Sequence, residues 1–151
     1  VRDMGLYDQL KAHNECLWHW DPEKQLVPED ATNAEIYITS ANGVSEEGEI
    51  INIDGRGNRV ASTLFGHRKV YFIIGLNKIA ENYDAALRRA RDVAGPLNAK
   101  RLGMTTPCAR VGHCCNCHSP QRICRALVVL WAKPFGIEEA EVVIVEDLLG
   151  Y

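Results

Sequence analysis

The residues best suited to chemistry lie in one short segment, from Pro107 to Arg125, which holds five of the six cysteines and two of the five histidines. Clustering of this kind is typical of a metal centre, a redox dithiol or a disulfide framework. Four of the thiols follow the spacing CxxxxxCxxCxxxxxxC, and Cys115 is a fifth thiol inside the central CxxC. The four spaced residues are Cys108, Cys114, Cys117 and Cys124.

A four-thiolate metal centre is the interpretation that we favour for this spacing. A CxxC pair reaches one ion from a tight turn, and the two outer cysteines complete the set. Structural zinc usually uses two such pairs, whereas one pair flanked at wider spacing is nearer to a plant-type ferredoxin. We therefore expect an iron–sulfur cluster, [4Fe–4S], ahead of zinc, for which His113 and His118 are alternative ligands. The other interpretation is a loop of reduced thiols in which Cys115 and Cys124 pack as small hydrophobes.

The loop DGRGNR at 54–59 is a second candidate site. Its glycines let the backbone approach an anion, the following helix start offers N–H groups, and an arginine can hold a carboxylate by two hydrogen bonds. The expected substrate-binding residues are Asn42, Asp54, Gly55, Gly57, Asn58 and Arg59. The alternative is a conformational turn with its arginine solvated or paired to a glutamate. Glu46 and Asp54 are the candidate catalytic carboxylates, although one of the glutamates in the 43–48 turn is expected only to be solvated.

The surrounding pattern predicts an α/β domain that positions both segments. Residues 1–30 read as a helix followed by an irregular stretch, and residues 31–151 as the α/β core. Expected strands lie at 35–41, 49–53, 69–75, 126–132 and 141–146, the first two joined by a hairpin-like turn. A short helix is expected at 60–65, and a longer one at 82–94 closed by Gly95 and Pro96. The charged run Arg88, Arg89 and Arg91 on that helix is expected to face water.

Composition limits the classes of function. A chain of 151 residues predicts a single domain, and its formal charge of -3 argues against binding to nucleic acid or to a membrane surface. The apolar run at 126–132 is far shorter than the ~20 residues that cross a bilayer. Residues 1–20 carry charges where a secretory signal would be apolar, so we expect a cytoplasmic protein. Thiols stay reduced in that compartment, which favours ligands or redox groups over disulfides.

Three segments together resemble the lactate-utilisation (LUD) domain family. They are SANGVSEEGEIINIDGRGNRVASTLFG at 40–66, PLNAKRLGMTTPCARVGHCCNCHSPQRIC at 96–124 and EDLLGY at 146–151. The resemblance covers 31–151 and the short MGLYDQL helix. It implies a mostly parallel sheet flanked by helices, an α/β sandwich similar to sugar-phosphate isomerases and coenzyme A transferases, with the cysteine segment as an added loop. Members of the family usually begin with a strand, a helix and a glycine-serine loop, so we expect a domain truncated at its N-terminus.

The resemblance also implies a function, the oxidation of lactate or a related small hydroxy acid. In that interpretation the chain is a metal- or iron–sulfur-binding subunit that takes a small anionic substrate and works beside iron–sulfur redox proteins. One alternative is a stand-alone transferase or isomerase with Glu46 or Asp54 as general base, although Ser40, Ala41 and Asn42 stand where isomerases carry carboxylates. Another is a non-catalytic assembly module braced by zinc. The sequence leaves open whether the chain is an enzyme, and a homo-oligomer is compatible with it.

Overall fold

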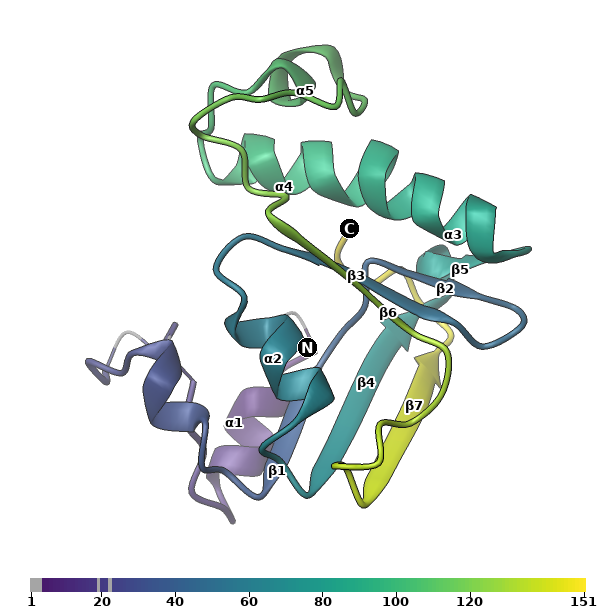
Figure 1. The fold of residues 1–151 in the computed structure, drawn as a ribbon. Helices are drawn as coiled ribbons and strands as arrows, with labels where there is room; N and C mark the ends of the chain where they lie inside the picture. Colours follow the sequence, from purple (N-terminus) through teal and green to yellow (C-terminus); the bar gives the residue numbers. More distant parts are fainter. Residues whose placement is uncertain (1–3, 19, 22) are drawn as a thin grey trace.

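Two sheets and several short helices make up the fold (Figure 1). The computed structural model describes residues 4–18, 20–21 and 23–151. The strands are β1 (Ile36–Thr39), β2 (Gly43–Ser45), β3 (Ile50–Asp54), β4 (Lys69–Gly75), β5 (Ile79–Ala80), β6 (Ala126–Leu130) and β7 (Glu139–Val145). The helices are α1 (Leu6–Lys11), α2 (Asn58–Leu64), α3 (Tyr83–Arg89), α4 (Gly95–Arg101) and α5 (Pro107–Val111), with 3-10 helices η1 (Pro28–Ala31) and η2 (Leu76–Lys78) and a π-helical turn η3 (Ala90–Ala94). None of these helices is long and apolar enough to cross a bilayer.

The strands divide into a parallel sheet and a mixed sheet. The parallel sheet has the order β1-β4-β7. The mixed sheet has the order β5-β2-β3-β6, in which only β2 and β5 pair in parallel. The predicted α/β class, with a mostly parallel sheet flanked by helices, is confirmed. The chain crosses from the first sheet to the second at Ser40–Asn42, so the predicted strand at 35–41 ends early and the hairpin is formed by β2 and β3 alone.

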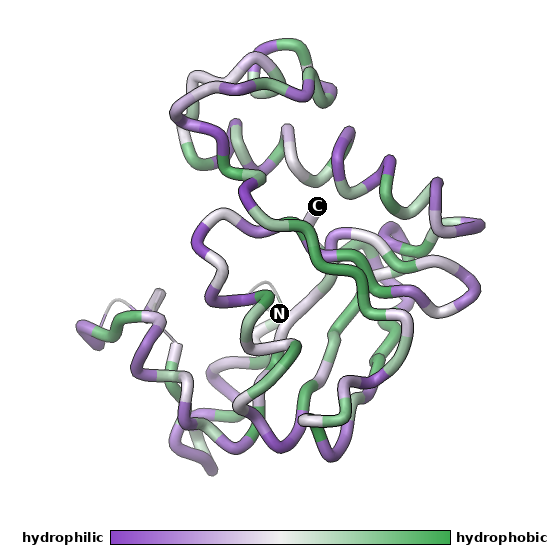
Figure 2. The backbone as a smooth tube through the Cα atoms, in the orientation of Figure 1, coloured by the Kyte–Doolittle hydropathy of each residue, from purple (hydrophilic) through white to green (hydrophobic). Residues whose placement is uncertain are grey.

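The core lies where the two sheets face each other. Residues of β2, β3, β4 and β6 form one cluster with two loop residues: Ala41, Val44, Ile50, Val70, Phe72, Ile74, Leu130 and Ile137. A smaller cluster joins Ile51 of β3 to Ala86 and Ala90, so α3 and η3 cover the outer face of the mixed sheet. Figure 2 shows the hydrophobic colouring concentrated where β3 and β6 run together, with hydrophilic residues along the outside of the long helix. Burial of this apolar surface holds the long helix on the mixed sheet.

The long helix runs without a break from Tyr83 to Arg101 (Figure 1). The Asn82 side chain caps its start by accepting a hydrogen bond from the Ala85 N–H at 3.0 Å. The expectation that Gly95 and Pro96 end the helix is wrong. The Gly95 N–H bonds to the Ala90 carbonyl five residues back, and this wider turn lets the helix pass a proline, which has no N–H to donate.

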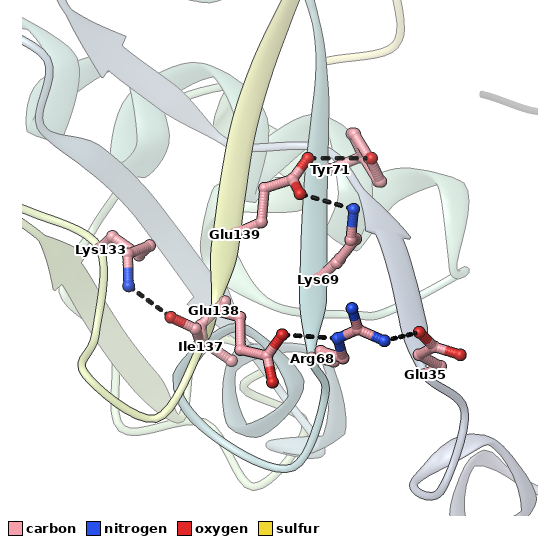
Figure 3. Close-up of polar contacts among 8 residues, drawn as sticks. All are labelled: Glu35, Arg68, Lys69, Tyr71, Lys133, Ile137, Glu138 and Glu139. Carbon is pink, nitrogen blue, oxygen red and sulfur yellow. Dashed lines mark hydrogen bonds and ion pairs between the residues drawn. The ribbon is translucent and has the colours of Figure 1, made fainter.

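A network of charged side chains joins the amino ends of the parallel strands (Figure 3). The Arg68 guanidinium bridges Glu35 at 2.6 Å and Glu138 at 2.5 Å, and Lys69 pairs with Glu139 at 2.6 Å. These side chains are largely exposed, so water and salt screen each pair and it contributes little to stability. Glu35, Glu138 and Glu139 therefore lie at the amino ends of the parallel strands. The carboxyl ends of β1 and β4 are at the opposite end of the sheet.

Candidate functional site

The cysteine segment forms a lobe above the end of the long helix (Figure 1). Helix α5 begins with Pro107 at its first position and ends at Gly112, whose φ of 83° is left-handed. The loop that follows carries no regular structure until β6. Within it, Asn116 has a φ of 45° and turns the backbone between Cys114 and Cys117. The tight turn predicted for the CxxC pair is therefore present.

One cavity of about 220 Å³ is lined by four cysteines. They are Cys108, Cys114, Cys117 and Cys124, the four that the spacing analysis selects. The fifth thiol, Cys115, lies outside the cavity on the exposed surface, with its Sγ 3.5 Å from the His113 carbonyl oxygen. All six cysteines of the chain are free thiols. The lining also includes Arg91, Arg122 and Arg125, so the cavity combines soft sulfur donors with positive charge.

Hydrogen bonds attach Cys114 to the π-helical turn. Its Sγ accepts from the Arg91 guanidinium at 3.7 Å and from the Asn116 backbone N–H at 3.4 Å. Its own backbone N–H donates to the Asp92 carboxylate at 3.1 Å. A guanidinium and a backbone N–H group are therefore both directed at the Cys114 sulfur. Of the arginine run expected to face water, Arg88 and Arg91 are exposed, although Arg91 also lines the cavity, whereas Arg89 is half-buried and departs from the expectation.

Arg122 holds the other side of the cavity. Its Nε donates to the Cys124 carbonyl at 2.7 Å, and its Nη1 donates to the Cys117 carbonyl at 2.9 Å. One guanidinium therefore fixes the backbone of two of the predicted ligands. Neither Arg91 nor Arg122 was expected from the sequence, although the position of Arg122 between two cysteines is a signal that could have suggested it.

The four cysteines line one cavity, but their sulfur atoms are not close enough together to hold a metal ion. Across residues 4–18, 20–21 and 23–151, no group of three or more His, Cys, Asp or Glu side chains is close enough to hold a metal ion. His113 and His118 are exposed and do not line the cavity. The residues fit a thiolate-bound group in number, type and enclosure, and the four cysteine ligands stay a prediction.

Asp54 organises the DGRGNR loop. Its carboxylate accepts hydrogen bonds from the backbone N–H groups of Gly55 at 2.8 Å, Gly57 at 3.2 Å, Arg59 at 3.1 Å and Val60 at 3.4 Å. The Gly57, Arg59 and Val60 N–H groups belong to the start of α2 and have no partner within the helix, and Gly57 supplies the left-handed φ of 96° that the turn requires. The N–H groups that were expected to meet a substrate anion are thus used by the protein's own carboxylate.

Arg59 ties the crossing between the sheets to β3. Its guanidinium donates to Asn52 Oδ1 and the Ile53 carbonyl at 2.7 Å each, and to Asn42 Oδ1 at 3.2 Å. A longer contact of 3.4 Å reaches the Ser40 carbonyl. The structure therefore brings Asn42, Asp54 and Arg59 together, with Gly55, Gly57 and Asn58 in the adjoining turn. Substrate binding by these residues stays a prediction.

Glu46 lies apart from that group. The β2–β3 register pairs Gly43 with Ile51 and Val44 with Ile50, which places Glu46 at the tip of the hairpin and Asp54 at the other end of β3. Glu46 is exposed, and its backbone N–H donates to the Ala80 carbonyl at 2.9 Å. The two candidate catalytic carboxylates therefore do not share a cleft.

The two candidate sites meet through their backbones. A Cβ at Gly55 would lie 2.7 Å from the Ile123 carbonyl oxygen, so only glycine permits this approach. The Arg125 N–H donates to the Asp54 carbonyl at 2.9 Å. Cys124, between these two contacts, is thereby fixed against the end of β3.

Comparisons with known proteins identify relatives of this arrangement. The family model for the LUD domain matches residues 2–145. No curated protein matches the chain. Among solved structures, a DUF162 family protein from Deinococcus radiodurans is similar, with 16% sequence identity and a TM-score of 0.44 over 79% of this chain. The chain spans 58% of the length of that structure.

Proposed function

Because the chain belongs to the LUD domain family, we propose that it is an iron–sulfur-binding subunit in the oxidation of lactate or a related small hydroxy acid. The family name supplies the link to lactate utilisation. The single observation that supports an iron–sulfur site is the cavity lined by Cys108, Cys114, Cys117 and Cys124 but not by Cys115. A cluster bound there would supply one-electron chemistry, which hydroxy-acid oxidation can use to pass electrons to iron–sulfur redox partners.

The residues around the cavity support a redox role for such a group. Hydrogen bonds to sulfur and nearby positive charge raise the reduction potential of a thiolate-bound centre, and Arg91 and the Asn116 N–H supply both at Cys114. Ile53 and Leu87 contribute apolar walls that limit the access of water. The protein's contribution is therefore hydrogen bonds and positive charge at the Cys114 sulfur, together with apolar walls around the cavity.

The loop between Gly112 and Ile123 allows the sulfurs to converge. It carries no strand or helix hydrogen bonds, so moving Cys114 and Cys117 inward breaks no regular structure. Metal sites commonly reach their final geometry only when the metal binds, with ordering coupled to binding. In the proposal, the cytoplasm supplies the reducing conditions that keep these thiols available.

The test is anaerobic reconstitution of the purified chain with ferrous iron and sulfide, followed by absorption spectroscopy and iron and sulfide analysis. We expect brown protein with broad absorbance near ~400 nm. Single changes to alanine at Cys108, Cys114, Cys117 or Cys124 should abolish or strongly reduce it. Cys115→Ala is the matched control, because it removes a neighbouring thiol that lies outside the cavity.

Two outcomes would reject the iron–sulfur proposal. Colourless protein with stoichiometric zinc would identify the cavity as a structural zinc site and favour an assembly module. Colourless, metal-free protein with all six thiols titratable would reject a metal site altogether. A transferase or isomerase based on Asp54 receives no support from the geometry, because its carboxylate already accepts from four N–H groups.

A further inference from the structure

A buried lysine stands at the carboxyl end of the parallel sheet. Lys78 closes η2, the short turn that follows β4, and only 6% of its surface is exposed. Its ammonium donates to Ser40 Oγ, directly after β1, at 2.9 Å. In open α/β sheets, ligands bind outside the carboxyl ends of the parallel strands. Lys78 and Ser40 follow adjacent parallel strands at that edge.

The Lys78 ammonium has donors to spare. An ammonium offers three hydrogen bonds, and Ser40 Oγ accepts one of them. Over the described part of the chain, no carboxylate lies within 4.0 Å of Lys78, whereas Lys11, Arg68 and Lys69 all form ion pairs. An ionised group buried without a counter-charge is costly, and proteins seldom keep one without a use.

Two further cations face the same place. Arg59 approaches from α2 and bonds the Ser40 carbonyl and Asn42 Oδ1, and Arg89 approaches from α3 and bonds the Asn42 carbonyl. Arg89 also donates from Nε to the Asn77 carbonyl at 2.5 Å. Burial first, then Arg89 and Arg59, lowers the pKa of Lys78 from 10.5 to about 8. Burial likewise lowers the pKa of Arg89.

The acceptors around these cations are neutral. Ser40, Asn42, Asn52 and Asn77 supply hydroxyl, amide and carbonyl oxygens, and none of them cancels the positive charge. Neither Arg59 nor Arg89 pairs with a carboxylate in the described residues. We propose that Lys78, Arg59 and Arg89 form an anion-binding site in which Lys78 is the direct ligand of a small carboxylate such as a 2-hydroxy acid.

The charge of the ligand follows from three cations without a counter-ion, whereas the choice of a carboxylate over a phosphate rests on the proposed function. The backbone of Gly150 borders the ammonium, since a Cβ there would lie 3.5 Å from Lys78 Nζ. The Asn77 side chain holds this segment by donating to the Gly150 carbonyl at 3.3 Å and accepting from the Leu149 N–H at 3.1 Å. A ligand that reaches Lys78 would displace or contact this segment.

The test is isothermal titration calorimetry of the full chain, without metal, with L-lactate, inorganic phosphate and chloride as probes. We expect saturable binding of L-lactate, weakened at least tenfold in Lys78→Met, whose side chain is neutral and of similar length. Lys100→Met, which removes an exposed lysine, should bind as the wild type. Equal affinity in the wild type and Lys78→Met, or no binding of any probe, would overturn the site.

A measurement on the wild type alone guards against a variant that fails to fold. Titrations at pH 8.5 in two buffers of different ionisation enthalpy report proton uptake. An anion at Lys78 raises the pKa of the ammonium, so binding should take up a fraction of a proton, and its absence would contradict direct contact. Phosphate binding that depends on Lys78, without lactate binding, would overturn the carboxylate class. Since no metal is present, none of these results depends on the iron–sulfur proposal.

Discussion

Replacing Lys78 by methionine should stabilise the protein at neutral pH and lose that advantage in alkali. The pKa of the ammonium is about 8 in the folded protein against an ordinary value of 10.5, so keeping it charged in the fold costs about 3 kcal/mol. The side chain is 6% exposed, so water does little to screen this cost. Methionine fills a similar volume without a charge and removes it.

The sign of the pH dependence follows from proton binding. Between pH 8 and 10.5 the unfolded chain holds more protons on Lys78 than the folded chain does, so wild-type stability rises with pH in that window. The cost is fully present below pH 8 and disappears above 10.5. The stability advantage of Lys78→Met should therefore shrink by about 2–3 kcal/mol between pH 7 and pH 10.

Urea denaturation under reducing conditions at four pH values between 7 and 10 measures this effect. Tyrosines and thiols also titrate here, but their contributions cancel in the difference between wild type and variant. The exposed Lys100→Met variant should run parallel to the wild type. Parallel curves for Lys78→Met as well would show that Lys78 is not a desolvated ammonium, and would refute the reasoning. Saturating anion should narrow the difference at pH 7, because it supplies the missing counter-charge.

Three further outcomes follow from the geometry. Gly43→Ala should lower the free energy of unfolding, measured by urea denaturation, by about 1–3 kcal/mol, because its Cβ would lie 2.5 Å from the Ala86 carbonyl oxygen. Gly95→Ala should be neutral or stabilising, because its Cβ would meet only a 3.4 Å contact. Equal effects of the two changes would contradict this reasoning. Asp54→Ala should cost about 1–2 kcal/mol by uncapping α2, and Asp54→Asn less, so a neutral Asp54→Ala would remove the capping role. Chelation of a reconstituted cluster should leave the far-ultraviolet circular dichroism nearly unchanged; loss of most of the signal would mean that the metal holds the core.

Local pattern was sufficient for the elements with a strong apolar signature. The run KVYFIIG became β4 over the predicted residues because a strand covered on both faces needs continuous apolar side chains. The spacing also selects the four cysteines that line one cavity, and their role as ligands stays a prediction. Both features are encoded within a few consecutive residues.

Features that depend on contacts between residues far apart in the chain could not be predicted from local sequence patterns. The crossing of the chain between sheets at Ser40–Asn42 is set by which strands pair, and pairing leaves no local trace. The helix continues past Gly95 and Pro96 because Ala90 packs against Ile51 of the mixed sheet, and the π turn at Ala90–Ala94 accommodates the proline. Lys78 is one of 17 basic residues, and only the assembled fold makes it a buried one.

The two backbone contacts at Gly55 and Asp54 determine how much of the protein a metal must organise. They hold Cys124 against β3, and α5 holds the buried Cys108, so the fold already positions two of the four cysteines that are predicted as ligands. Cys114 and Cys117 lie between Gly112 and Ile123, a stretch without strand or helix hydrogen bonds that is attached to the fold through Arg91, Asp92 and Arg122. A metal bound in this cavity would therefore require rearrangement of one loop and not of the strands and helices that position Cys108 and Cys124.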